Sequence, residues 1–517
     1  MSTAEIRGRQ LLIPAGLLLV AAALRFWGIT WAAPERIDLH PDEMDHVMTH
    51  ALAVSFADPD PKFLNYPSFL IYAIALANGL LSRLGLVTES WHSYVVGRSI
   101  VATFGALTAP AAFWLGLEIA GSLGGAALAG LWVALMPLHV WESHFAVTDI
   151  VMTFWITVAL ALSVRLLRSA KFSDILLTGA VIGAGIASKY TAALVAISPL
   201  IAMALAARPL ETTLRGLFGL GLAALTVCFL GTPFTFLHFS EFRADMAFEY
   251  AHVRSLHYGF SLPALGWQYH KYVYELFAGW PFSLGVALYA AAAAGAIWAL
   301  VRPRRETVVV LGFALLFFAI LGRWTFKPLR YQLPMLVIAA VYAGLWQGSW
   351  IEAGRTWQRA VATVAAVATL VYTAIFTIQT TARFRNDTRI QAARWLDETL
   401  PGRLLIIGNV HYVALPSDPR IDVKIRNEAL IGKVPQWTDF DLAEITSMHY
   451  SRHERHRHHL FLPAYEHLRN GGASLQLVKR FEADFLNRDL YSRLDPMFGG
   501  YFISPTIEFY SRRDQPS

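Results

Sequence analysis

Asp38-Leu39-His40-Pro41-Asp42-Glu43-Met44-Asp45-His46 is a stretch that follows closely after the first long apolar run of the chain. It places four carboxylates and two imidazoles within nine residues. Charge of this density beside a bilayer is unfavourable unless it faces water or a substrate. The pattern therefore indicates either a solvated acidic loop or a polar site that the rest of the chain holds against a membrane.

The composition decides between a soluble and a membrane protein. The 517 residues are 55% hydrophobic and only 15% charged, and the mean hydropathy is +0.43. Soluble globular domains carry about 25% charged residues. We therefore predict an integral membrane protein, in which 16 Trp and 19 Tyr suit interfacial belts. The single cysteine, Cys228, excludes a disulfide framework and a cysteine-based metal site.

Apolar runs of about 20 residues predict membrane-spanning helices. The first follows Arg7 and Arg9, which predicts an uncleaved helix with its N-terminus in the cytoplasm. We predict eleven spans in all. They lie at about 11–30, 94–117, 123–141, 150–168, 175–190, 191–207, 213–232, 276–301, 306–321, 328–347 and 358–381.

The segment 66–86 is ambiguous by length, and the distribution of positive charge decides its placement. If it does not span, every short basic loop falls on the cytoplasmic side, as the positive-inside rule requires. We therefore predict a re-entrant or juxtamembrane helix on the outer face. The basic loops carry Arg168, Lys171, Arg208, Arg215, Arg302, Arg304, Arg305, Arg355 and Arg359. The outer face then receives 31–93, 142–149, the neighbourhood of Lys189, 233–275, 322–330 and everything after 382.

The composition changes after Thr381, which divides the chain into two predicted domains. Residues 1–381 form a polytopic all-α membrane domain, and 382–517 form a soluble α/β domain outside the membrane. The second domain is large enough to hold its own core. In it we predict a helix at 388–400 capped by Thr388, and strands at 404–408 and 503–510. The histidine-rich run 453–459 fits a solvated helix face better than a metal site, because its spacing encloses no ion.

Three carboxylates are candidates for chemistry. An ionised Asp42, next to Glu43, could accept a proton from an acceptor hydroxyl at the membrane surface. The alternative is that Asp42 only caps a helix that begins at Glu43. Asp149 lies at the outer end of a predicted span, where it could orient the first loop, bind substrate, or merely cap the helix.

Several cations fall at outer helix ends. Lys189, Lys327 and Arg330 could each extend to the interface, as long basic side chains do. Together with Lys62, they could instead bind a phosphate, because Arg offers two parallel contacts and Lys a point charge. A lipid-linked phosphate is the one expected at this depth.

Short motifs in a fixed order carry a resemblance. The chain from about residue 20 to its end resembles the lipid-carrier-dependent glycosyltransferases of the C superfamily (GT-C). It is most similar to the protein O-mannosyltransferases and to the aminoarabinose transferases that modify lipid A. The motifs are His40-Pro41-Asp42-Glu43, Asn65-Tyr66-Pro67, Ser143 to Asp149, Gly185-Ile186-Ala187-Ser188-Lys189-Tyr190, Arg330-Tyr331-Gln332-Leu333-Pro334 and Pro505 to Tyr510.

The resemblance implies a reaction and a set of site residues. A sugar would move from a polyprenyl phosphate to an acceptor lipid, polysaccharide or protein at the outer face of the cytoplasmic membrane, with inversion. Asp42 would be the base, with Glu43 and Asp149 beside it. Lys189, Lys327, Arg330 and Tyr331 would hold the donor, without a metal ion or other cofactor. His144 and Tyr66 stand where many members have Arg and Lys, which makes Lys62 the candidate replacement for the latter.

Two other classes of function are open to the sequence. A transporter or lipid flippase places polar groups near the bilayer midplane between repeated halves, whereas here the mid-helix positions are nearly all apolar. A membrane-anchored binding protein would leave the polar outer loops unexplained. Nothing in the sequence indicates a nucleic-acid partner. The identity of the sugar, the acceptor and the oligomeric state are not encoded in any motif.

Overall fold

The structure is a computed structural model that describes residues 3–169, 171–255, 270–426, 440–450, 475–486 and 504–512, with 465, 469, 488 and 490 as isolated residues. The histidine-rich run 453–459 and part of the predicted outer loop 233–275 lie outside the described residues.

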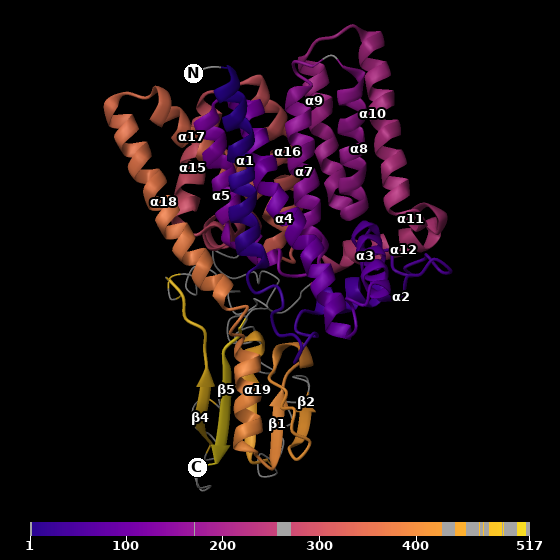
Figure 1. Cartoon of the computed structure of the whole chain (residues 1–517), viewed down its shortest axis with the longest axis vertical. Coiled ribbons are helices and arrows are strands. Elements are labelled where there is room, and N and C mark those ends of the chain that lie inside the picture. The colour runs from indigo at the N-terminus through magenta and orange to yellow at the C-terminus, as the bar shows by residue number, and fades with distance from the viewer. Residues whose placement is uncertain are drawn as a thin grey trace.

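A bundle of long apolar helices forms one part of the molecule, and a small sheet domain lies beyond one end of it (Figure 1). Among the described residues, five helical segments are long and apolar enough to cross a membrane: α4 (Ser90–Ala120), α7 (Thr148–Arg165), α10 (Leu210–Gly231), Leu329–Ala353, and α18 (Thr356–Ala382). Shorter apolar helices stand among them, so the chain is a multi-span membrane protein, while the count of eleven spans stays a prediction. The shorter ones include the apolar part Leu12–Phe26 of α1 (Thr3–Phe26), α5 (Leu123–Leu135), α8 (Phe172–Ser188), α9 (Ile197–Leu205) after the 3-10 turn η2 (Tyr190–Ala196), α15 (Val286–Val301) and α16 (Arg305–Leu321).

Two predicted spans are broken in the structure. The segment predicted at 123–141 divides into α5 and α6 (Pro137–Glu142), because Pro137 has no N–H to continue the hydrogen bonding of α5. The segment predicted at 276–301 divides into η4 (Glu275–Gly279), α14 (Trp280–Leu284) and α15. Gly285 separates the last two with φ of 74°, a conformation that glycine adopts without a steric penalty.

The helix α17 (Leu333–Ala353), which follows the predicted Arg-Tyr motif, packs closely against α5. A Cβ on Gly344 would lie 2.3 Å from the backbone nitrogen of Ala129 on α5. Helices in membranes pack through such small residues, since lipid tails give no hydrophobic drive for association. The glycine thus sets the position of α17 and of the turn before it.

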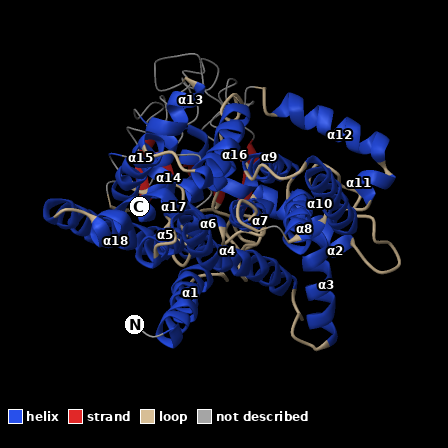
Figure 2. Ribbon diagram, turned by 90° about the horizontal axis from the view of Figure 1, so that it is seen from above, coloured by secondary structure: helices blue, strands red, loops and turns tan. Residues whose placement is uncertain are grey.

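Short helices gather at the end of the bundle that faces the sheet domain. They are α2 (Thr49–Ala53), α3 (Phe69–Arg83), α11 (Phe234–Leu237), α12 (Phe239–His252) and α13 (Lys271–Tyr274). Seen from above, α3 and α12 lie lengthwise at the periphery (Figure 2). With 15 residues, α3 is shorter than a typical span of about 20, and the re-entrant or juxtamembrane placement of 66–86 stays a prediction.

The predicted basic loops meet at the opposite end of the bundle. Arg168 pairs with both Glu118 and Glu306, and Arg208 donates to the carbonyl of Leu166 at 2.8 Å. The N-terminus and the α17–α18 connection lie at the same end (Figure 1). The predicted basic loops and the first acidic loop therefore lie at opposite ends of the bundle.

The sheet domain has five described strands in the order β2-β1-β3-β5-β4. β1, β2 and β3 are parallel, and β5 is antiparallel to both β3 and β4. Alternate residues of β1 pack on α19 on one face and on a second cluster containing Tyr450 and Tyr465 on the other, which explains the uninterrupted apolar run of β1. The bounds are α19 (Thr388–Thr399), β1 (Arg403–Ile407), η6 (Val410–Tyr412), β2 (Asp422–Arg426), β3 (Leu442–Thr446), β4 (Leu475–Phe481) and β5 (Ile507–Arg512).

Two details of this domain differ from the prediction. The cap of α19 is Asp387, whose carboxylate accepts from the N–H of Arg389, and not Thr388, whose hydroxyl instead donates to the carbonyl of Pro505. The last strand begins at Ile507 and not at 503, because Pro505 cannot donate to a ladder and Ser504 has a positive φ.

The sheet domain is attached to the first loop. Arg389 donates to the carbonyls of Leu39 at 3.2 Å and His411 at 2.8 Å, and its own charge is paired with Asp387. Arg36 in the loop donates to the carbonyl of Val410 at 2.8 Å. The backbone that leads into Asp42 is therefore held by the sheet domain.

Candidate active site

Asp42 is the first residue of η1 (Asp42–Met48), a π-helical turn. Pro41 precedes it, and the Nδ1 atom of His40 accepts from the N–H of Glu43 at 3.2 Å, which closes the start of the helix. Among the described residues, the Asp42 side chain makes no capping bond, and it instead accepts from the Arg330 guanidinium. The alternative that Asp42 caps a helix from Glu43 is wrong.

Asp149 lies in the first turn of α7 and joins two cations. Its Oδ1 accepts from Lys189 Nζ at 2.6 Å, and its Oδ2 lies 3.5 Å from Arg330 Nε. The cap position of α7 is occupied by Val147, and Asp149 lies two residues further on, inside the helix. Asp149 is therefore a bridge between the two cations and not a helix cap. The first loop, the end of α8, the start of α7 and the turn η5 (Leu329–Gln332) thus converge.

Two tyrosines border these charges. Lys189 Nζ lies 4.3 Å from the centre of the Tyr331 ring and 5.9 Å from that of Tyr66. The Tyr66 hydroxyl lies 3.4 Å from His46 Nδ1, on the same π-helical turn as Asp42. We refer to Asp42, Asp149, Lys189 and Arg330, together with these two tyrosines, as the open cluster.

The open cluster is partly accessible to solvent, as a site that binds and releases a ligand must be. The side chain of Asp42 is 20% exposed and that of Lys189 14%, whereas Asp149 is 3% exposed. Burial tends to raise the pKa of Asp42, but the Arg330 guanidinium outweighs it and holds that pKa below its ordinary value. Asp42 is therefore a carboxylate at neutral pH, and its basicity is limited by Arg330.

Glu142, at the end of α6, is a further carboxyl group that the sequence analysis did not single out. Burial raises its pKa to about 7; Arg330 opposes this shift, and Asp149 and Asp42 add to it. Within the described part of the chain its Oε2 atom is buried without a hydrogen-bond partner. A third carboxyl group is thus influenced by the two cations that Asp42 and Asp149 bind, and burial raises its pKa to about 7.

Glu43 is separate from the open cluster although it follows Asp42 directly. Its two carboxylate oxygens accept from Nε and Nη2 of Arg98 on α4, both at 2.8 Å, and Oε1 also accepts from the N–H of Ala146 at 2.9 Å. The side chains are 0% and 1% exposed. We call this the closed pair; it links the first loop to α4 and to the 142–149 loop.

Lys327 is engaged in another buried pair. Its Nζ lies 3.1 Å from Glu275 Oε1, and the same oxygen accepts from the side chain of Gln332 at 3.2 Å. Burial lowers the pKa of Lys327, and Glu275 opposes that shift. Lys327 therefore lies beside the η5 turn that carries Arg330 without reaching the charges of the open cluster by any described contact.

Two other predicted donor-binding residues are not brought into the open cluster. Lys62 is 65% exposed and pairs with Asp60 at 3.0 Å and Asp58 at 3.5 Å. His144 is fully buried and stacks on Phe384, with its ring nitrogens facing the carbonyls of Val140 and Trp27.

A signal for one missed residue was present in the sequence. Arg98 stands inside the predicted span 94–117, where an ionisable side chain is unfavourable unless it is paired. That rule predicts a buried carboxylate partner, although it does not identify Glu43. Glu142 and Glu275 lie at helix ends, where local sequence gives no sign that tertiary packing buries them.

Comparisons with known proteins bear on the family and on the fold. A family model described as dolichyl-phosphate-mannose-protein mannosyltransferase matches residues 45–244. No curated protein matches the chain in sequence.

Solved structures share the fold. ArnT from Cupriavidus metallidurans, in a structure bound to undecaprenyl phosphate, is 14% identical with a TM-score of 0.51, and the alignment covers 100% of both chains. The oligosaccharyltransferase AglB from Archaeoglobus fulgidus, solved with an inhibitory peptide and a dolichol-phosphate, is 13% identical with a TM-score of 0.54, over 97% of this chain and 88% of that one.

Proposed function

We propose that the chain is a membrane glycosyltransferase of the GT-C class, of the protein mannosyltransferase type, with a lipid-phosphate-linked sugar donor, and that the open cluster is its transfer site. One observation carries the proposal. The Arg330 guanidinium lies between Asp42 and Asp149, and Asp149 also binds Lys189. A candidate base and two candidate phosphate ligands therefore occupy one place.

The donor phosphate would bind Lys189 and Arg330. Both cations are already fixed by Asp149, so little side-chain entropy remains to be lost when an anion arrives. Arg330 offers a planar pair of donors and Lys189 a point charge. The rings of Tyr331 and Tyr66 exclude water from one side of Lys189, which strengthens the attraction.

Donor binding would also activate the base. A phosphate on Arg330 competes with Asp42 for the same guanidinium. Because that guanidinium is what holds the pKa of Asp42 low, its engagement by phosphate lets the pKa rise and makes Asp42 a better proton acceptor. The ion pair in this structure thus corresponds to the resting state.

The transfer step would be a single displacement at the anomeric carbon of the sugar. A hydroxyl or amine of the acceptor attacks the anomeric carbon, the bond from that carbon to the phosphate oxygen breaks, and Asp42 takes the acceptor proton. The phosphate leaves on its polyprenyl chain with its negative charge stabilised by Arg330 and Lys189. One displacement inverts the configuration at the anomeric carbon.

The other predicted residues would position Asp42, Lys189 and Arg330. Asp149 positions both cations, and Glu43 holds η1 on α4 through Arg98. Lys327 and Glu275 support the η5 turn, since Glu275 also binds Gln332. We expect the reaction to need no metal ion.

The position of the basic loops supports an orientation in the membrane. Loops bearing Arg168 and Arg208 lie at the bundle end away from the open cluster, and the positive-inside rule assigns that end to the cytoplasm. The open cluster and a soluble domain of residues 382–517 would then lie outside the cytoplasmic membrane, with residues 1–381 within it. Polar groups at a bundle end favour an enzyme over a transporter, whose site lies near the midplane.

An Asp42→Asn variant tests the base, with Asp45→Asn as a matched control. Asp45 lies on the same turn and its side chain is 49% exposed. We expect Asp42→Asn to lower transfer roughly 10²–10⁴-fold while the purified protein still binds undecaprenyl phosphate, and Asp45→Asn to keep near-normal transfer. Transfer is measured by mass spectrometry of glycolipids and glycoproteins from cells that lack the chain and carry each variant. Near-normal transfer by Asp42→Asn would refute the assignment.

A further inference from the structure

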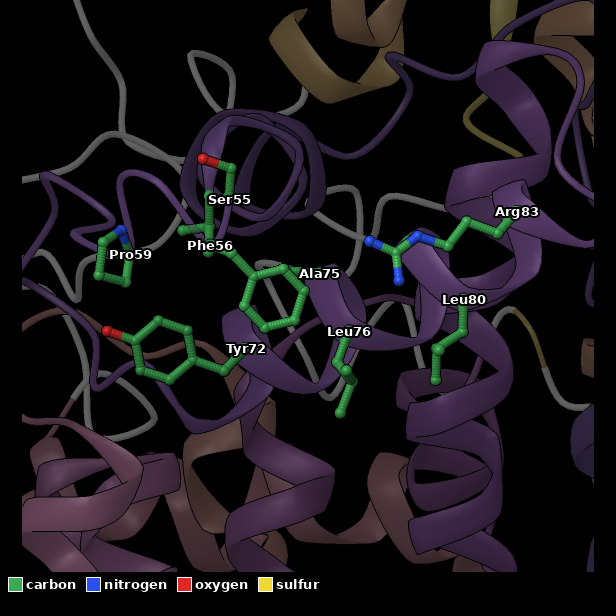
Figure 3. A pocket seen from close by; sticks show the side chains of 10 residues that line it. Ser55, Phe56, Pro59, Tyr72, Ala75, Leu76, Leu80 and Arg83 are labelled. Atoms are coloured by element: carbon green, nitrogen blue, oxygen red, sulfur yellow. The ribbon is translucent and has the colours of Figure 1, made fainter.

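A groove lies between the turn that follows α2 and the helix α3, and no residue of the open cluster lines it (Figure 3). It has a volume of about 470 Å³, within the range of roughly 300–1,000 Å³ for ligand pockets. Its walls are mainly apolar. The residues used below are Phe56, Pro59, Leu76, Gly79, Leu80 and Arg83.

The walls of the groove are unusually exposed for apolar side chains. Phe56 is 87% exposed, Leu76 56% and Leu80 51%. They lie at the end of the bundle where α3 runs along its periphery (Figures 1 and 2). At the edge of a bilayer such a groove is suited to a hydrocarbon chain and not to a small polar solute.

Charge distinguishes the two ends of the groove. Arg83 turns its guanidinium into one end (Figure 3), and among the described residues it forms no ion pair. The other end, at Pro59, adjoins Asp58, which pairs with Lys62. An occupant with an apolar tail and an anionic head would therefore lie with its head at Arg83.

We propose that this groove binds an anionic phospholipid of the surrounding bilayer, with its acyl chain along Phe56, Leu76 and Leu80 and its phosphate on Arg83. The site differs from that of the donor. Asp42 begins η1, whereas the groove starts after the end of α2 and its proposed anion ligand, Arg83, lies on α3.

Gly79 allows the groove to be filled without disturbing the fold. It lines the groove on α3, and a Cβ added there meets no atom within 4 Å. A Gly79→Phe variant therefore places a ring in the space proposed for the acyl chain. Gly221 on α10 also has no atom within 4 Å of an added Cβ, so Gly221→Phe is the matched control.

Native mass spectrometry of the purified full chain, with dioleoyl phosphatidylglycerol or phosphatidylcholine added, measures the bound lipid. We expect the wild type and Gly221→Phe to retain one phosphatidylglycerol that Gly79→Phe loses. Arg83→Gln should weaken phosphatidylglycerol binding at least fivefold and leave phosphatidylcholine unchanged. Equal retention by Gly79→Phe, or equal binding of the two lipids by the wild type, overturns the proposal.

A competition experiment separates this site from the donor site. Undecaprenyl phosphate added at increasing concentration should bind alongside phosphatidylglycerol, giving a species that carries both lipids. One-for-one displacement would show that the two lipids share a single site and would overturn the assignment. Because this readout needs no sugar transfer, it is independent of the outcome for Asp42→Asn.

Discussion

Asp42 and Glu43 are neighbours on one turn, yet the structure places them in opposite environments. Glu43 is 0% exposed, and its carboxylate accepts three hydrogen bonds, two from Arg98 and one from Ala146. Asp42 is 20% exposed and shares Arg330 with Asp149. The closed pair is saturated and dry, whereas the open cluster retains access and a cation that more than one anion can use.

The difference shows what separates a structural ion pair from a functional one. Taking two charges out of water is compensated only when every donor and acceptor is satisfied, as in the closed pair. A pair that is to exchange one partner for a ligand must keep a path to solvent and an incomplete set of contacts. By this criterion Arg330 can change partners and Arg98 cannot.

Breaking the closed pair should produce the largest loss of stability. Arg98→Met leaves a buried carboxylate without its cation, which costs about 3–5 kcal/mol in comparable cases, and thermal unfolding in detergent should show the loss. The double variant Glu43→Gln, Arg98→Met removes both charges and should recover part of it. An unchanged melting temperature for Arg98→Met would show that the pair does not hold η1 on α4.

The same conservative substitution in the two pairs sharpens the comparison. Arg330→Lys keeps the charge but loses the planar pair of donors, so we expect undecaprenyl phosphate to bind about 100-fold more weakly, or about 2.7 kcal/mol. Arg98→Lys should lower the melting temperature and leave that affinity within about threefold. Isothermal titration with both purified variants checks this, and an unaltered affinity in Arg330→Lys would contradict the proposed phosphate ligand.

Much of the fold could be predicted from the sequence because the membrane imposes a simple pattern. Apolar runs of about 20 residues and basic loops identify the bundle, and the run Leu404 to Ile407 identifies a strand buried on both faces. The breaks at Pro137 and Gly285 were missed because hydropathy does not register a change of backbone conformation within an apolar run.

The candidate site was predictable in part. Residue types and helix ends pointed to Asp42, Asp149, Lys189 and Arg330, which the structure brings together. The surroundings of Lys327, His144 and Lys62 depend on partners distant in sequence or on local turns, and no periodicity encodes them. Glu142 was not predicted as a site residue, because a carboxylate at a helix end is ordinarily solvated and its burial depends on tertiary packing.

The pH dependence of donor binding gives the smallest expected effect and distinguishes Glu142, beside the open cluster, from the buried Glu444 of the sheet domain. Glu142 has a pKa raised to about 7 by burial, so it is mostly protonated below pH 7 and adds a negative charge beside Arg330 above it. Affinity for undecaprenyl phosphate should therefore fall, by at most about tenfold per pH unit, as pH rises through 7. The second ionisation of a phosphate, with a pKa near about 6, contributes equally to all variants.

Glu142→Gln should flatten this dependence between pH 6 and 8, whereas Glu444→Gln should not. Glu444 is buried in β3 of the sheet domain and its pKa is also raised by burial, to about 8. Each raised pKa stabilises the fold below the ordinary carboxyl range, and that contribution is lost as pH rises through the folded-state value. Both variants should thus flatten the dependence of melting temperature on pH, but only Glu142→Gln should alter donor binding. An equal change of affinity in both would show that Glu142 is not the group whose titration governs donor binding.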